Sequence, residues 1–221
     1  MDENLKNEIA ALGRTFGASR ITLFGSRARG DHRERSDIDI AVFGLPSQHE
    51  DAFLNGIDNL PTLLNFDIVF VAPYTSAELL NNIKKDGVIL MDKAQEKFEK
   101  FNRAVIRLQE VLADYDHYQI ESLKDAVIQR FSFCSELAWK TTREVLIDQG
   151  YTEANTPKAV MRQAYEAGYV SDGSAWIKLL NSRNLVAHVY NEETAQEIFD
   201  QIRLCFLPLM QQLLVALKNA L

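Results

Sequence analysis

The stretch Gly25–Ile40, GSRARGDHRERSDIDI, decides how the first half of this 221-residue chain folds. It directly follows the apolar run ITLF and ends inside a second β-type run that continues to Phe43. The pattern predicts a strand, a Gly-Ser turn that opens a helix, and a second strand. Because side chains alternate between the two faces of a strand, Asp37 and Asp39 point one way and the isoleucines that follow them point into a core.

The charges of this stretch indicate a site for a cation and a phosphate. Two carboxylates on one strand face lie roughly 6–7 Å apart, and their repulsion is about 2–3 kcal/mol at an effective dielectric constant near 20. A hard divalent cation with oxygen ligands removes that repulsion. The Gly25-Ser26 turn aims backbone N–H groups and the positive end of a helix at one spot, which suits a phosphate. Two-metal phosphoryl or nucleotidyl transfer uses this combination.

The spacing of these residues resembles the GSxARG…SDxD signature of the DNA polymerase β-type nucleotidyltransferases, specifically the minimal nucleotidyltransferase family. The match runs from Gly25 to Gly30 and from Ser36 to Asp39. The resemblance implies that Asp37 and Asp39 hold two Mg²⁺ ions and that ATP or another nucleoside triphosphate is the substrate. It also implies that the nucleotide is bound by Gly25, Ser26, Arg27, Arg29 and Ser36.

The family takes a third carboxylate from a neighbouring strand, and Asp67 in the run FDIVF fits that position. Asp67 lies on the strand face opposite Phe66 and Ile68, so it would complete a three-carboxylate site. The residues also allow a plainer interpretation, a solvated strand edge beside a charged loop. In that case the arginines of the loop pair with Asp31 and Glu34.

Composition places the chain among ordinary globular proteins, with 47% hydrophobic and 25% charged residues. The net charge of −7 argues against a general coat of nucleic acid, which needs a broad basic surface. Cys134 and Cys205 stand far apart in apolar helical settings, so we expect free thiols and a reducing, cytoplasmic location. The apolar run 204–217 contains Pro208 and two glutamines, which favours a bundle helix over a membrane span.

Two domains are expected. Helical and strand patterns alternate through residues 1–93, which predicts a small α/β domain with a mixed sheet. Strand signals vanish from Ala94, and residues 94–221 predict an all-α antiparallel helical bundle. Helix starts are predicted at Thr156-Pro157, where a capping threonine precedes a proline, and at Thr194.

The run RNLVAHVY, residues 183–190, is the second motif. Arg183 and His188 lie about 140° apart around a regular helix, whereas Asn184 and His188 share a stripe. Residue chemistry alone favours an Arg183 that pairs with a nearby acidic residue and a His188 that is a satisfied polar group. The pattern Arg-Asn-x-x-x-His-x-Tyr resembles the HEPN superfamily, in the nucleotidyltransferase substrate-binding branch that pairs with minimal nucleotidyltransferases.

The HEPN resemblance implies a metal-independent ribonuclease that works across a homodimer interface, with RNA as a further partner. His188 would then be the general acid or base, and Arg183 would stabilise charge on the phosphate. In related toxin–antitoxin pairs the transferase adenylylates a tyrosine of this motif, which makes Tyr190 the expected AMP acceptor. Alternatively, Tyr190 simply packs its ring.

The leading hypothesis is therefore a Mg²⁺-dependent enzyme that transfers AMP from ATP, with Asp37, Asp39 and Asp67 as its catalytic residues. The chain would form a single-chain toxin–antitoxin system. One alternative is a HEPN ribonuclease toxin that the N-terminal half regulates. Another is a non-catalytic helical half that binds the nucleotide or the substrate. No membrane partner is expected.

Overall fold

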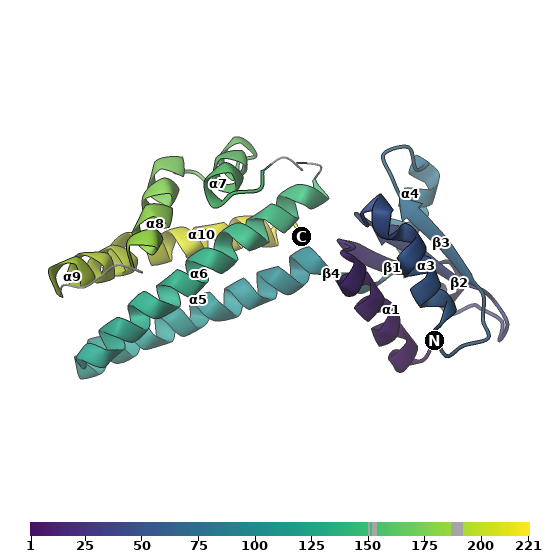
Figure 1. The fold of residues 1–221 in the computed structure, drawn as a ribbon, viewed down its shortest axis with the longest axis horizontal. Helices are drawn as coiled ribbons and strands as arrows, with labels where there is room; N and C mark the ends of the chain where they lie inside the picture. Colours follow the sequence, from purple (N-terminus) through teal and green to yellow (C-terminus); the bar gives the residue numbers. More distant parts are fainter. Residues whose placement is uncertain (150, 152–153, 187–191) are drawn as a thin grey trace. The chain divides into compact units, whose positions relative to one another are not determined.

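The computed structural model describes residues 1–149, 151, 154–186 and 192–221 (Figure 1). These residues divide into two compact units, Met1–Lys93 and Ala94–Leu221. The first unit is a sheet with helices and the second is helical, so the predicted fold class is confirmed.

The N-terminal unit is built on a four-stranded sheet with the order β3-β2-β1-β4. Strand β1 is antiparallel to both of its neighbours, and β2 is parallel to β3. The strands are β1 (Arg20–Phe24), β2 (Ile38–Phe43), β3 (Phe66–Val71) and β4 (Val88–Asp92).

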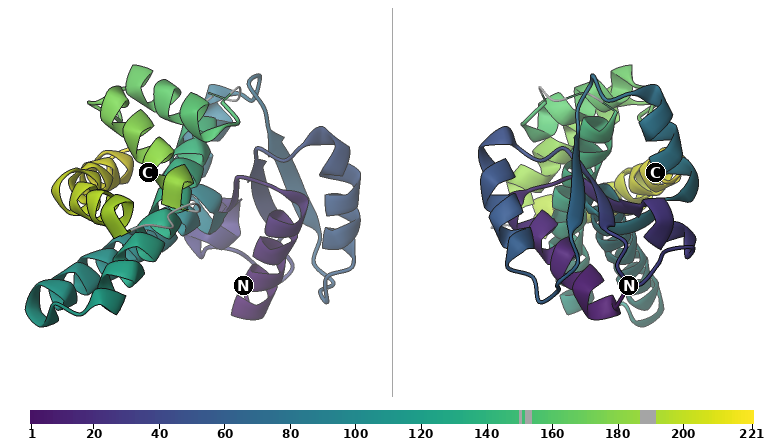
Figure 2. Two further views of the ribbon diagram at one scale, coloured as in Figure 1. Left: turned by 60° about the vertical axis from the view of Figure 1, so that its left-hand side comes forward. Right: turned by 90° about the vertical axis from the view of Figure 1, so that its right-hand side faces the viewer.

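Helices cover both faces of this sheet (Figure 2, right). Helices α1 (Glu3–Phe16) and α3 (Glu50–Asp58), with the short 3-10 turn η1 (Ser47–His49), lie on the face that holds the apolar core. Helices α2 (Gly25–Arg29) and α4 (Ala77–Asp86) lie on the other face and contact each other. The apolar core on this face is formed by side chains of the strands and of the helices, including Ile9, Leu23, Ile40, Phe53 and Ile57.

The C-terminal unit is a bundle of long and short helices, with α5 and α6 the longest of the described helices (Figure 1). Its elements are α5 (Lys93–Tyr118), α6 (Glu121–Asp148), α7 (Pro157–Glu166), α8 (Gly173–Val186), α9 (Glu192–Gln201), the π-helical turn η2 (Ile202–Phe206) and α10 (Leu207–Lys218).

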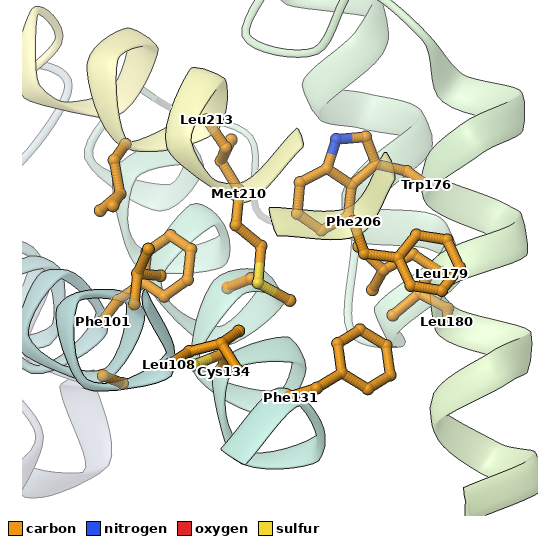
Figure 3. Close-up of a cluster of buried hydrophobic side chains, with 14 of the residues drawn as sticks. Phe101, Leu108, Phe131, Cys134, Trp176, Leu179, Leu180, Phe206, Met210 and Leu213 are labelled. Atoms are coloured by element: carbon orange, nitrogen blue, oxygen red, sulfur yellow. The ribbon is translucent and has the colours of Figure 1, made fainter. Parts of the chain in front are cut away.

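The core of the bundle is filled by large apolar side chains from most of its helices (Figure 3). The rings of Phe131 and Phe206 stack with their centroids 5.3 Å apart, and Trp176 and Met210 are buried in the same cluster. Cys134 is a free thiol in this core, and burial raises its pKa to about 12, so it stays protonated. Such a thiol behaves as a small apolar residue.

One helical stretch, Glu192–Lys218, is long and apolar enough to cross a membrane by length and composition alone. Part of it is buried in the bundle: Phe206, Met210 and Leu213 belong to the core cluster (Figure 3). A core helix of a globular domain meets the same two criteria.

One of the two predicted helix starts agrees with the structure. Gly17 ends α1 with φ +87°, and the Thr156 hydroxyl accepts a hydrogen bond from Ala159 N at 3.3 Å at the start of α7. The prediction that Thr194 caps a helix is wrong, because α9 already begins at Glu192. Two glutamates in the first turn suit the positive end of the helix.

The stacked ring of Phe131 gives a test of the bundle core. We expect Phe131→Ala to lower the free energy of unfolding of the bundle by about 3–5 kcal/mol, because the side chain is fully buried. The matched variant Phe133→Ala, two residues along α6, removes a ring that is 60% exposed and should cost less than about 1 kcal/mol. Urea unfolding followed by far-UV circular dichroism measures both, and equal losses would contradict the assignment.

Candidate functional site

The pairing of β2 with β3 brings two of the predicted carboxylates together. Strand β2 begins at Ile38, so Asp37 directly precedes it and Asp39 is its second residue. The two strands are parallel, and Asp39 stands opposite Asp67 in their register. Paired residues of neighbouring strands share a face. Asp39 is half-buried and Asp67 is exposed on the face away from the core.

Gly25 brings the start of α2 against the Asp39 carboxylate. Phe24, the last residue of β1, pairs with Asp39, so the next residue turns directly beside it. Gly25 has φ +69°, and a Cβ atom there would lie 2.1 Å from Asp39 Oδ2. Only glycine permits both the backbone conformation and this close approach. The Gly-Ser turn and the carboxylates are therefore neighbours in space, as the sequence predicts.

The electrostatics indicate that the three carboxylates interact. The pKa of Asp39 is raised above its ordinary value, first by burial and then by the negative charges of Asp67 and Asp37. The positive charges of Arg29 and Arg27 oppose this rise without cancelling it. Asp39 therefore sits in a negative field that a bound cation would relieve.

Arg27 holds the loop that presents Asp37. Arg27 is buried, and its Nε and Nη2 both donate to the Ser36 carbonyl, at 3.0 and 2.7 Å. The same group donates to the carbonyls of Glu34 and Asp37, at 3.1 and 3.2 Å. Four hydrogen bonds from one cation fix the backbone just before β2. Arg27 thus positions the loop, and its predicted contact with the nucleotide stays a prediction.

The other predicted nucleotide ligands lie in the same loop and turn. Ser36 Oγ accepts a hydrogen bond from Arg33 N at 3.0 Å, so it shapes the turn before β2. Arg29 is exposed, and its Nε lies 3.2 Å from Asp31 Oδ2, the pairing that the plainer interpretation expects. An exposed pair of this kind is worth only about 0–1 kcal/mol, so it does not prevent Arg29 from binding an anion.

The donor set fits a hard divalent cation. Asp37, Asp39 and Asp67 offer carboxylate oxygens, which are the ligands that Mg²⁺ prefers. Across the described parts of the chain, no three histidine, cysteine or acidic side chains lie at the spacing of a metal site. Burial, and then the charges of Asp67 and Asp37, raise the pKa of Asp39, and a bound cation would oppose that rise.

In the helical unit, Arg183 pairs with an acidic residue of another helix. Arg183 Nη2 donates to Glu136 Oε2 at 3.1 Å, and Nη1 donates to Asn184 Oδ1 at 3.2 Å. Glu136 also accepts from Trp139 Nε1 at 3.1 Å and pairs with Lys140 Nζ at 2.8 Å. The pairing expected from residue chemistry alone is therefore confirmed. His188 and Tyr190 lie outside the described residues.

A cavity of about 250 Å³ opens beside this ion pair. Its walls include Ser135, Glu136, Trp139, Thr156, Lys158 and Arg183. Burial alone would raise the pKa of Glu136, but hydrogen bonds from Lys140 and Trp139 and the charges of Lys140 and Arg183 together lower it below its ordinary value. Glu136 therefore stays ionised and keeps Arg183 in place.

Sequence reasoning missed Glu136 and Trp139 as partners of the Arg183 motif. Both lie on α6, and Glu136 is 47 residues before Arg183 in the sequence. Only the packing of α6 against α8 brings them close to Arg183. The one local signal is the spacing of Glu136 and Lys140, which is that of a helical ion pair.

Gly25 at the start of α2 and Gly30 just after its end give a matched test of the site geometry. Gly25→Ala should lower the free energy of unfolding by about 2–3 kcal/mol, because two costs add. The new Cβ collides with Asp39, and alanine is strained in the left-handed backbone conformation of this position. Gly30→Ala should cost only about 1 kcal/mol, since Gly30 has φ +82° and nothing within 4 Å of its Cβ position. Urea titrations of both variants measure the difference. A Gly25→Ala variant as stable as Gly30→Ala would show that Asp39 is not pressed against the turn.

Among curated proteins, the chain is similar to a probable ribonuclease HepT from Haemophilus influenzae. The two are 30% identical over 86 residues, which cover 37% of this chain and 59% of that protein. The chain thus spans less than two thirds of the length of this relative.

Two solved structures are also similar. One, from Thermus thermophilus, is 29% identical with a TM-score of 0.47 and covers 53% of this chain and 98% of its own. The other, from Haemophilus influenzae, is described as revealing the fold of a substrate binding domain of a nucleotidyltransferase. It is 25% identical with a TM-score of 0.49 and covers 55% of this chain and 98% of its own.

Two family matches divide the chain between them. Residues 7–96 match the polymerase beta nucleotidyltransferase family, and residues 96–219 match the family described as nucleotidyltransferase substrate binding protein like. The chain therefore belongs to the nucleotidyltransferase substrate binding protein like family, with a polymerase β-type nucleotidyltransferase domain preceding that helical domain.

Proposed function

We propose that the N-terminal domain transfers AMP from ATP to an acceptor hydroxyl. The observation that carries the proposal is the parallel register of β2 and β3, which sets Asp39 opposite Asp67 beside the Gly25 turn. Carboxylates on neighbouring strands next to a phosphate-sized turn are what nucleotidyl transfer requires.

Each part of the site has a role in this reaction. Asp37, Asp39 and Asp67 would hold two Mg²⁺ ions, and Gly25 and Ser26 would bind the triphosphate. Bound Mg²⁺ supplies charge neutralisation at the phosphates and activation of the attacking oxygen. The acceptor hydroxyl gives up its proton to water and its oxygen bonds to the α-phosphorus. The bond from that phosphorus to the bridging oxygen breaks, and pyrophosphate leaves with the electron pair of that bond. Arg27 keeps Asp37 in line by holding the carbonyls before it.

The test uses ATP labelled on the α-phosphate together with Mg²⁺. We expect the wild-type chain to release pyrophosphate or to become labelled, and Asp37→Asn and Asp39→Asn to lose at least about a hundredfold in rate. The matched control is Asp51→Asn on α3, which removes an exposed carboxylate from the opposite side of the sheet. Equal rates for Asp39→Asn and Asp51→Asn would remove the proposal. An AMP adduct found on Tyr190 by mass spectrometry would identify the acceptor.

A second candidate function is RNA cleavage by the helical domain. It is supported by Arg183 beside a cavity and by the similarity to a protein named probable ribonuclease HepT. Arg183 and His188 would together form a metal-independent site for RNA cleavage. The N-terminal domain would silence this site, so that the chain is a single-chain toxin–antitoxin system. The helical domain would form a homodimer. The alternative is a helical domain that only binds the nucleotide or the acceptor.

Growth experiments separate these alternatives. Expression of Asp39→Asn, whose transferase half is disabled, should slow growth, and adding Arg183→Ala to the same chain should restore it. Each purified variant is also incubated with RNA and EDTA. The Asp39→Asn chain should cut the RNA, and the chain that also carries Arg183→Ala should leave it intact. If neither variant affects growth or RNA, the helical domain acts by binding alone.

A further inference from the structure

A basic groove on the helical unit is used by none of the functions above. It lies between α5 and α6, has a volume of about 190 Å³ and is lined by Lys100, Arg103, Arg107, Arg130 and Phe133, together with Ala104. We call these residues the α5–α6 groove. Arg183 and the cavity beside it are formed by other residues.

The positive charges of the groove are concentrated and largely uncompensated. Lys100, Arg103 and Arg107 are three and four residues apart, so they form one stripe along α5, and Arg130 adds a fourth cation from α6. Arg103 Nη1 lies 3.9 Å from Glu99 Oε2, a weak exposed pair. For the remaining three cations, the described chain shows neither an ion pair nor a hydrogen bond.

The groove concentrates positive charge that an anionic ligand would neutralise. Like charges on neighbouring helical turns repel each other, and the whole chain has a net charge of −7, so the excess of cations is local. Phe133 lines the same groove with 60% of its surface exposed, which leaves a large apolar ring in water. An anion would relieve the repulsion, and a flat ring stacked on Phe133 would cover the apolar surface.

A single-stranded polynucleotide provides both features in one ligand. Its phosphates accept charge-assisted hydrogen bonds from guanidinium groups, and its unpaired bases stack on exposed aromatic rings. A duplex keeps the faces of its bases stacked inside, so it offers Phe133 nothing. We propose that the α5–α6 groove binds single-stranded RNA, with phosphates on Arg103, Arg107 and Arg130 and one base on Phe133. The choice of RNA over DNA rests on the second candidate function. The proposal that the groove binds a single strand does not rest on that function.

The test is fluorescence anisotropy with a labelled 2′-O-methyl oligouridylate of about 12 nucleotides, a length that can span the groove. The methylated sugar cannot be cleaved through its 2′-oxygen, and EDTA excludes nucleotidyl transfer. Binding is therefore measured apart from both proposed activities. We expect Arg107→Glu and Arg130→Glu each to weaken binding about tenfold and to lower the slope of log K against log salt by about 0.7 per lost contact between about 50 and 200 mM salt.

Phe133→Ala should weaken binding about tenfold with an unchanged salt slope, because stacking involves no counterion release. The matched control is Arg162→Glu, which makes the same charge change at an exposed arginine of α7 and should bind like the wild type. The groove assignment fails if Arg107→Glu binds like the wild type, or if Arg162→Glu weakens binding as much. Displacement of the oligonucleotide by an equal concentration of ATP or duplex RNA would also overturn it, and displacement by single-stranded DNA would overturn the choice of RNA.

Discussion

The register between two parallel strands is the constraint on which the N-terminal site depends. Strands β2 and β3 place Asp39 opposite Asp67, while their alternating isoleucines and phenylalanine face the core. A slip of one residue would turn Asp67 towards the core and end the pairing of charges. The apolar face therefore fixes the position of the polar face, and burial of the core stabilises a cluster of like charges that would not form by itself.

Both units contain groups whose charges oppose folding, and this links their structures to binding. Burial and the nearby charges of Asp67 and Asp37 raise the pKa of Asp39, and the stripe from Lys100 to Arg107 brings cations close together in the same way. Arg183 shows the opposite arrangement, because Glu136 balances it and keeps it oriented. Clusters of like charges without a partner are expected where the protein binds a ligand of opposite charge. A cation paired with a carboxylate, in contrast, keeps a fixed orientation.

Much of the fold could be predicted because the signals are local. Strand alternation around Asp39, the capping Thr156 and the loss of strand patterns after residue 93 gave the elements and the change of fold class. The prediction for Thr194 was wrong because a capping residue type is also tolerated inside the first turn of a helix, where Thr194 lies. Contacts between distant segments, such as Glu136 with Arg183, follow from packing that one sequence does not encode in any local pattern.

The site was predictable to a similar degree. The spacing of Gly25 and Asp39 indicated their closeness, whereas the role of Arg27 as a clamp on three carbonyls needed coordinates. The central claim is that Asp39 and Asp67 share a cation. Electron paramagnetic resonance titration with Mn²⁺ in place of Mg²⁺ tests it most directly: the wild-type chain with a non-hydrolysable ATP analogue should bind Mn²⁺, and Asp39→Asn and Asp67→Asn should each lose that binding. Undiminished Mn²⁺ binding by Asp67→Asn would contradict the account.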